Sequence, residues 1–137
     1  MALPERVHIR VITPDETSLD THAAIAVVPG ENGRFAIQPG QIPRIAALAP
    51  GVVEIAETGT RFFIAGGFVE IEAEQADLLV SGAQDATTLD ADDLALQLRN
   101  LDEDIADAAT DSERRALTGK RRVLKAALEA ASGQFVL

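Results

Sequence analysis

The sequence predicts an α+β protein in which an N-terminal antiparallel β-sandwich or flattened barrel precedes a C-terminal antiparallel α-helical hairpin. Three observations predict this fold class. Residues 1–87 form short apolar stretches broken by glycine and proline, which is typical of strands. Residues 89–131 repeat apolar residues every three or four positions, as amphipathic helices do. A polar turn divides this second part, so we expect a β-sandwich domain at 1–87 and a helical hairpin domain at 88–137.

The first strands are marked by alternation and by turn residues. In Val7–Ile12 branched apolar side chains alternate with polar ones, which predicts a half-buried strand with Val7, Ile9 and Val11 on one face. A mostly apolar stretch follows at residues 22–28. Asn32-Gly33 then predicts a tight hairpin before residues 34–37, because both residues tolerate the positive φ of such turns.

Glycine and proline separate the remaining strands. Pro50-Gly51 marks a turn, like Pro39-Gly40 before it, and Gly51–Ile55 is expected to be the strand that follows. Residues 61–65 and 68–73 flank Gly66-Gly67, where a double glycine indicates a bulge or a close approach of two backbones. A last apolar stretch at residues 78–80 closes the series, and strands this short and regularly spaced favour a sandwich or flattened barrel.

The first helix is predicted by a narrow apolar seam with a cap before it. Asp90 is placed to cap the N-terminus, and Asp92 and Asp93 lie in the first turn, where the helix dipole favours acids. The seam consists of Leu94, Leu98, Leu101, Ile105 and Ala108.

The second helix has its own start and stop signals. Thr110 and Glu113 have capping-box spacing, and Gly133 suits the position just after the last turn. Its seam consists of Leu117, Leu124, Leu128 and Ala131. Because the link between the helices is short, they are expected to lie antiparallel.

Composition limits the classes of function. The chain has 137 residues, no cysteine and a formal net charge of −10, so we expect no disulfide, no thiolate metal site and no broad contact with nucleic acid. No apolar run approaches the roughly 18 residues that span a bilayer, and Glu5 and Arg6 interrupt the start before a signal-peptide core. We therefore expect a soluble cytoplasmic chain without direct membrane insertion, whose partners are proteins.

The charge is divided between the helices. Residues 90–107 carry seven acids and the base Arg99, a net −6, whereas residues 110–137 carry a net +3. The helices are expected to attract one another, although the apolar seam supplies most of the stability of the hairpin. The basic run of the second helix has two readings that stay open, a solvated face that pairs with the first helix or a docking surface for an acidic partner.

No set of residues is typical of catalysis, of a metal site or of a cofactor site. His8 and His22 lack nearby ligands and are expected at the surface or on an edge strand. The acids Asp92 and Asp93 are adjacent on a helix and point in different directions, which indicates a solvated face. Residues 30–33 lie in a hairpin and lack the lysine that follows a phosphate-binding loop.

The order of these segments resembles the epsilon subunit family of bacterial F-type ATP synthases. The resemblance covers nearly the whole chain and is strongest over residues 7–71. The matching pieces are the strand at 7–14, the block Val28-Pro29-Gly30-Glu31-Asn32-Gly33-Arg34-Phe35-Ala36-Ile37-Gln38-Pro39-Gly40, the turn and strand at 50–53, and Ala65-Gly66-Gly67-Phe68-Val69-Glu70-Ile71.

The resemblance implies a non-catalytic rotor subunit that joins the gamma subunit to the ring of c subunits at the cytoplasmic face of the bacterial inner membrane. It implies a ring-side contact through Glu31, Asn32, Gly33, Arg34 and Gln41, with Arg34 standing where acids are common in relatives. It further implies a hairpin that regulates by contacting the catalytic alpha and beta subunits through Arg114, Arg115, Arg121, Arg122 and Lys125. The alternatives are a stand-alone interaction module with a helical dimerisation arm and, more remotely, a small hydrolase.

A nucleotide motif of some relatives is altered in this chain. Those relatives bind ATP at the start of the first helix through Ile or Leu, then Asp, two variable residues, Arg and Ala. Here Asp93 and Leu94 occupy the arginine and alanine positions of that motif. Because a carboxylate repels a phosphate, we expect no cofactor and no ATP binding in the micromolar range.

Overall fold

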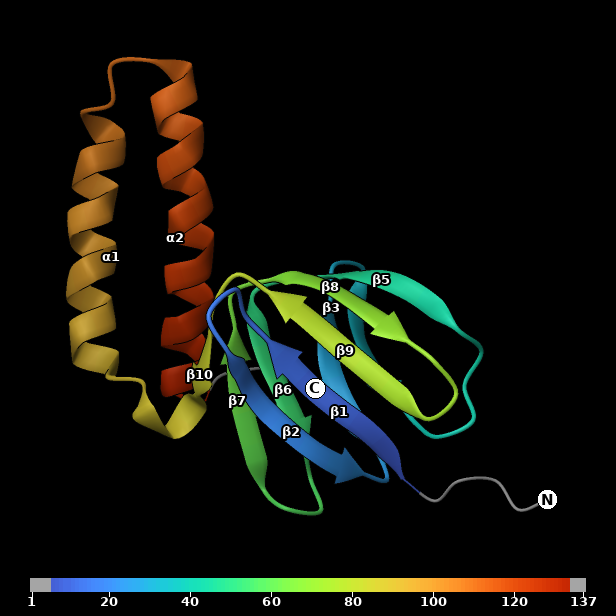
Figure 1. Ribbon diagram of the computed structural model, residues 1–137. Coiled ribbons are helices and arrows are strands. Elements are labelled where there is room, and N and C mark those ends of the chain that lie inside the picture. The colour runs from blue at the N-terminus through green and yellow to red at the C-terminus, as the bar shows by residue number, and fades with distance from the viewer. Residues whose placement is uncertain (1–5, 134–137) are drawn as a thin grey trace.

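The computed structural model describes residues 6–133. Residues 1–5, which include Glu5, and residues 134–137, which end the expected hairpin domain, lie outside the described residues. Strands curl into a nearly closed sandwich, and two helices stand beside it (Figure 1). The strands are β1 (Val7–Ile12), β2 (Thr17–Ala23), β3 (Ala26–Gly30), β4 (Gly33–Ile37), β5 (Arg44–Leu48), β6 (Gly51–Ile55), β7 (Thr60–Ile64), β8 (Gly67–Ile71), β9 (Gln75–Val80) and β10 (Ala83–Asp85). A 3-10 turn (Ala86–Thr88) leads to α1 (Ala91–Ala106) and α2 (Asp111–Ala131). The α+β fold class is confirmed.

The strands form one continuous hydrogen-bonded path in the order β10-β7-β6-β3-β5-β8-β9-β1-β2, with β4 paired to β3. Neighbours along this path are antiparallel except β1 and β9, which run parallel. This parallel pair joins the first strand of the chain to the ninth, in a register that runs from His8 opposite Gln75 to Ile12 opposite Leu79.

The core follows the predicted alternation. Val7, Ile9 and Val11 are fully buried, and they share one apolar cluster with buried residues of the neighbouring strands β9 and β8 and of β3, β6 and β7. The main apolar cluster is formed entirely by side chains of the sandwich. The hairpin therefore contributes nothing to this cluster.

The mostly apolar stretch at 22–28 spans the end of β2 and the start of β3. The chain turns between β2 and β3, where the backbone N–H of Ala24 donates to Glu57 Oε1 at 2.6 Å. The predicted hairpin forms between β3 and β4, but its turn residues are Glu31 and Asn32. The positive φ belongs to Gly33 alone of the predicted Asn-Gly pair, at 127°. Strand β5 was not predicted.

The double glycine is confirmed as a close approach of two backbones. A Cβ on Gly67 would lie 2.1 Å from the carbonyl oxygen of Leu79 on β9. Gly66 and Gly67 also have φ values of 102° and 151°, which L side chains rarely adopt. Strands β8 and β9 can pair at this point because residue 67 has no side chain.

The predicted caps form. The Asp90 carboxylate accepts hydrogen bonds from the N–H groups of Asp92 and Asp93, and Thr110 Oγ1 accepts from the N–H of Glu113. In a capping box the Glu113 side chain would accept a hydrogen bond from the N–H of Thr110. Here its Oε2 accepts from the N–H of Ala109, one residue earlier in the chain. After α2, Gly133 takes a φ of 74°.

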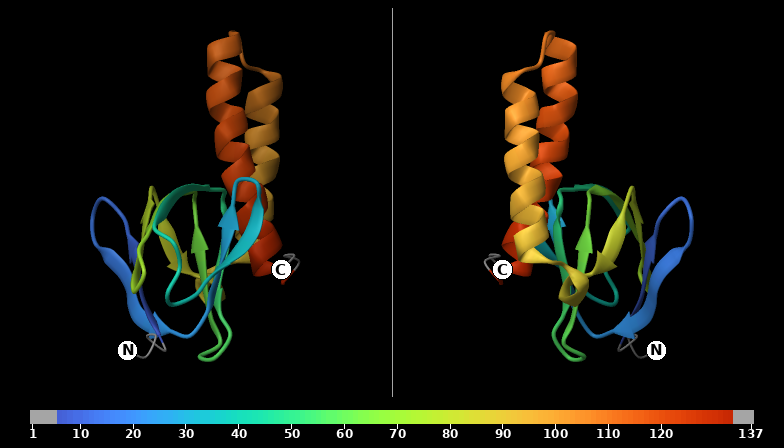
Figure 2. Two further views of the ribbon diagram at one scale, coloured as in Figure 1. Left: turned by 90° about the vertical axis from the view of Figure 1, so that its right-hand side faces the viewer. Right: turned by 90° about the vertical axis from the view of Figure 1, so that its left-hand side faces the viewer.

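Helix α2 packs on two sides. Its Leu124 and Leu128 belong to the predicted seam, but its most buried residues are Ala127 and Ala130, which pack with Val52 of β6 and Phe63 of β7. Only the C-terminal half of α2 contacts the sandwich, while the far end of the hairpin rises clear of it (Figure 2). This second face of α2 was not predicted, because alanine gives a weak apolar signal.

Candidate functional site

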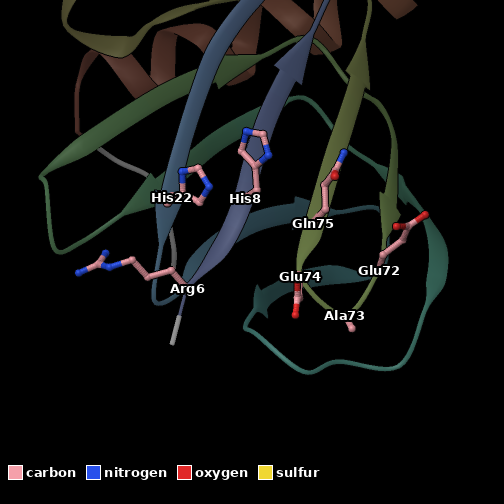
Figure 3. A pocket seen from close by; sticks show the side chains of 7 residues that line it. All are labelled: Arg6, His8, His22, Glu72, Ala73, Glu74 and Gln75. Carbon is pink, nitrogen blue, oxygen red and sulfur yellow. The ribbon is translucent and has the colours of Figure 1, made fainter. Parts of the chain in front are cut away.

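The two histidines lie side by side on the outer face of β1 and β2. Their rings stack with centroids 4.5 Å apart, and His8 Nε2 lies 2.5 Å from Asp20 Oδ1. The depression beside them is also lined by Arg6, Glu72 and Glu74, whose side chains point in different directions (Figure 3). Within residues 6–133 no three His, Cys, Asp or Glu side chains are placed to hold a metal ion. The arrangement is a surface pair, as expected from the sequence.

The outer face of β1, β9, β8 and β5 is arranged in bands across the strands. Phe68 lies opposite Ala47 on one side and Leu79 on the other, and Leu79 lies opposite Ile12. We call these four residues the apolar band. Ile42 and Ile45 extend the apolar surface along β5 and the loop before it, with exposures of 84% and 70%.

Phe68 is 57% exposed and Leu79 41% exposed. A surface of this kind marks a protein interface more often than a scattered exposed leucine does. This surface was not predicted from the sequence. A signal was available, because Phe68 stands between positions that the alternation of β8 assigns to the core.

A charged band runs next to the apolar band. Arg10 on β1 pairs with Asp77 on β9, with Nε–Oδ1 at 2.8 Å and Nη2–Oδ2 at 2.7 Å. The hydrogen bond from Arg10 holds the pKa of Asp77 below its ordinary value, and Gln75 adds a further hydrogen bond. These contacts fix the polar side chains in place beside the apolar surface.

The β3–β4 turn carries most of the predicted ring-side residues. Residues 30–34 line one side of a depression whose other side is formed by residues 44–47 of β5. Arg34 turns inward, where Nη1 donates to the carbonyl oxygen of Val52 at 2.8 Å. Burial lowers the pKa of Arg34, and the charge of Glu54 opposes that shift. The outward surface of the turn therefore consists mainly of Glu31, Asn32 and Gly33.

Gln41 is not brought together with this turn. Its Nε2 donates to the carbonyl oxygen of Ala36 at 3.0 Å, near the opposite end of β4. The predicted ring-side residues thus form two separate groups, one at each end of β4.

The predicted basic residues of α2 have different surroundings. Arg114 pairs with Asp111 of its own helix at 2.9 Å, and Arg115 Nε donates to the carbonyl oxygen of Asp111. Arg121 reaches α1, where its Nε lies 2.6 Å from Asp102 Oδ1. Lys125 is exposed and makes no ion pair within the described part of the chain. The two helices are thus joined by less charge pairing than their net charges suggested.

Arg122 joins α2 to the sandwich. Its Nη2 and Nη1 lie 2.5 Å and 3.3 Å from the two carboxylate oxygens of Glu31 in the β3–β4 turn. This hydrogen bond holds the pKa of Glu31 below its ordinary value. Arg61 of β7 adds a second polar contact, since its Nη2 donates to the carbonyl oxygen of Ala130 at 3.3 Å.

Comparisons with known proteins agree with this architecture. Residues 6–86 match the family described as ATP synthase, Delta/Epsilon chain, beta-sandwich domain. The chain is 31% identical to the ATP synthase epsilon chain of Rhodospirillum centenum, over 96% of each protein. It is 34% identical to the chloroplastic epsilon chain of Guillardia theta, over 92% of this chain and 98% of the relative.

Two solved structures share the fold. A chain in the Euglena gracilis mitochondrial ATP synthase structure, described as OSCP/F1/c-ring, superposes with a TM-score of 0.81 at 21% identity, covering 96% of this chain and 84% of that one. A chain in the Tetrahymena thermophila structure, described as central stalk/c-ring, gives 0.69 at 17% identity, covering 96% and 99%. No helix within residues 6–133 has the length and apolar character to cross a bilayer. From its matched sandwich domain and its full-length relatives, the chain belongs to the family of ATP synthase epsilon chains.

Proposed function

We propose that this chain is a non-catalytic rotor subunit of an F-type ATP synthase, which joins the gamma subunit to the c-subunit ring during proton-driven ATP synthesis. Family membership supports this role, because the relatives are ATP synthase epsilon chains. The two solved chains of the same fold come from assemblies that include a c-ring. The chain would act at the cytoplasmic face of the bacterial inner membrane, bound to the complex.

The observation that carries the proposal is the apolar band on the outer face of the sheet. Phe68 and Leu79 of the band, and Ile45 beside it, are exposed on a surface whose inner side is the core. Burying such side chains against a partner is favourable by about 25 cal/mol per Å² of apolar area. We assign this surface to the gamma subunit, which in this proposal holds the sandwich permanently.

The ring-side contact is assigned to the two ends of β4. Glu31, Asn32 and Gly33 form the outward part of one end, and Gln41 lies near the other. Polar and glycine residues at turns suit contact with polar loops. Arg34 contributes less directly, because its guanidinium points toward the backbone of Val52.

The exposed bases of α2 are assigned to the catalytic subunits. Arg114, Arg115 and Lys125 are exposed. An acidic segment of a partner would complement them. The hairpin then regulates the complex, while the sandwich supplies the mechanical connection.

A charged substitution in the apolar band tests the proposal. Phe68→Asp places a carboxylate in the centre of the band, and we expect it to reduce copurification of the chain with the gamma subunit at least tenfold. Leu96→Asp is the matched control, because Leu96 is 49% exposed but lies on α1. The control should copurify normally.

Normal copurification of Phe68→Asp would contradict the assignment of the band. If the wild-type chain instead elutes as a dimer and Phe68→Asp makes it monomeric, the band joins two copies of this chain. That result would favour the stand-alone interaction module.

A further inference from the structure

The contact between the hairpin and the sandwich has an apolar part and, within residues 6–133, polar contacts made by Arg61 and Arg122. In the apolar part, Ala127 and Ala130 of α2 and Leu94 of α1 form one cluster with Val52 and Phe63 of the sandwich. The polar contacts are the Arg61 hydrogen bond to Ala130 and the ion pair between Arg122 and Glu31. Only Val52 and Phe63 of the sandwich are among the buried members of this cluster, so the ion pair adds a polar contact beside a limited apolar surface of the sandwich.

The ion pair joins a residue that the proposed function assigns to the c-ring with a base of α2, the helix whose other bases it assigns to the catalytic subunits. Glu31 belongs to the β3–β4 turn on the ring side, and Arg122 belongs to the basic face of α2. Their side chains remain 41% and 57% exposed, so water and other proteins can reach both. While they are paired with one another, neither charge is free to pair with a partner.

We propose that the Glu31–Arg122 ion pair couples the position of the hairpin to the contact made by the β3–β4 turn. This inference rests on the proposed function. A cation of the partner that pairs with Glu31 releases Arg122, and the hairpin then leaves the sandwich more readily. The coupling is reciprocal, since a hairpin held elsewhere frees Glu31 for the partner of the turn.

The expected size of this coupling is modest. An exposed ion pair contributes between roughly zero and 1 kcal/mol, which corresponds to a change of up to about fivefold in an equilibrium. The pair therefore biases the docked position and does not lock it. Salt weakens such a pair, because the Debye length falls to about 3 Å at 1 M.

Thiol labelling of the full-length chain measures the opening of the contact directly. The chain has no cysteine, so Ala127→Cys introduces a single thiol at a position that is 4% exposed. In this background the rate of reaction with a maleimide reports the population in which α2 has left the sandwich. We expect Glu31→Gln and Arg122→Gln each to raise this rate about two- to fivefold.

A double-mutant cycle separates the ion pair from general loosening. We expect the double variant Glu31→Gln, Arg122→Gln to react no faster than the faster single variant, and the exchanged pair Glu31→Arg, Arg122→Glu to restore slow labelling. Arg121→Gln is the matched control, because Arg121 pairs with Asp102 on α1 and not with the sandwich. Its labelling rate should equal that of the Ala127→Cys parent.

Two results would overturn the coupling. One is labelling of the single variants at the parent rate, and the other is single effects that multiply in the double variant. The parent ATP synthase complex supplies the last measurement. There the Ala127→Cys chain should label at a rate close to that of Glu31→Gln, because the turn is in contact with its partner.

The outcome for the proposed function is measured separately. If the chain and its variants fail to copurify with the gamma subunit and the c-ring, the rotor assignment is wrong. If they copurify normally and the labelling rate in the complex equals that of the free chain, the coupling alone is wrong.

Discussion

Arg10 and Asp77 face one another across the parallel strands β1 and β9, and the guanidinium meets both carboxylate oxygens at 2.8 Å and 2.7 Å. This pair lies on the outer face of the sheet, above the fully buried Ile9 and Val11. The pair therefore fixes the positions of two charged side chains on the outer surface above the core.

The Arg10–Asp77 pair makes the free energy of unfolding depend on pH. Since Arg10 lowers the pKa of Asp77 from its ordinary 3.8, the contribution is present above that value and is lost as the pH falls through the folded pKa. We expect Asp77→Asn to destabilise the protein by about 1 kcal/mol at pH 7 and to flatten the fall in stability below about pH 4. Urea unfolding at several pH values is the measurement. Glu70→Gln on the neighbouring strand is the control. If the free energy of unfolding of Asp77→Asn falls at low pH as steeply as that of the wild type, the Arg10–Asp77 pair is not the cause of the acid dependence.

Gly67→Ala should prevent folding or cost more than about 3 kcal/mol, because the new Cβ would lie 2.1 Å from a carbonyl oxygen of β9. Gly59→Ala separates this clash from backbone strain. Gly59 also has a positive φ, 70°, but a Cβ there meets nothing within 4 Å. We expect that control to cost only about 1–2 kcal/mol in thermal or urea unfolding. Equal losses in the two variants would mean that conformation, and not the close approach, requires Gly67.

Gly119→Ala is expected to stabilise α2. Gly119 lies within the helix, and a Cβ at this position meets nothing within 4 Å. Replacing an exposed glycine inside a helix by alanine gains about 0.5–1 kcal/mol. Amide hydrogen exchange of residues 111–121 should slow accordingly. Faster exchange would indicate that the glycine is needed for the packing of the hairpin.

The fragment 1–87 is expected to fold without the hairpin, because the main apolar cluster lies wholly within the sandwich. Val52 and Phe63 lose their contact with α2, so stability should fall by about 1–3 kcal/mol. Circular dichroism and urea unfolding of the fragment test this, together with gamma-subunit pull-down. An unfolded fragment would show that the helices are part of the folding unit.

The chain is not expected to bind ATP in the micromolar range. Asp93 occupies the arginine position of the nucleotide motif, and its Oδ2 already accepts a hydrogen bond from Gln97 at 2.7 Å. Asp90 and Asp92 add negative charge at the same helix start. Calorimetric titration of the full-length chain with magnesium and ATP measures this, and saturable micromolar binding would show the prediction to be wrong.

Local patterns predicted the parts of the fold that local physics determines. The alternation of β1, the caps at Asp90 and Thr110 and the close approach at Gly67 each depend on neighbouring residues or on backbone conformation. Strand β5 was missed because it presents Ile45 to solvent and so lacks a regular apolar alternation.

The candidate surfaces were harder to predict. Glu31 and Arg122 are 91 positions apart, and no local pattern encodes their contact. The placement of α2 also depends on Ala127 and Ala130, whose small side chains hardly mark a buried face. The alternation of β8 marks Phe68 as exposed, but only the strand register shows that it lies beside Leu79 in the apolar band.

The continuous strand path has a mechanical consequence. A force that enters through β5, β8 and β9 would act on rows of hydrogen bonds that continue without a break to β10 on one side and β2 on the other. Such rows resist shear together, so the sandwich behaves as one stiff body. The helices are attached near one end of this path, through the 3-10 turn after β10 and through the packing of α2 on Val52 of β6 and Phe63 of β7. The apolar contact with the hairpin lies on β6 and β7, so a load that passes from β5 through β8, β9 and β1 to β2 crosses strands outside that contact.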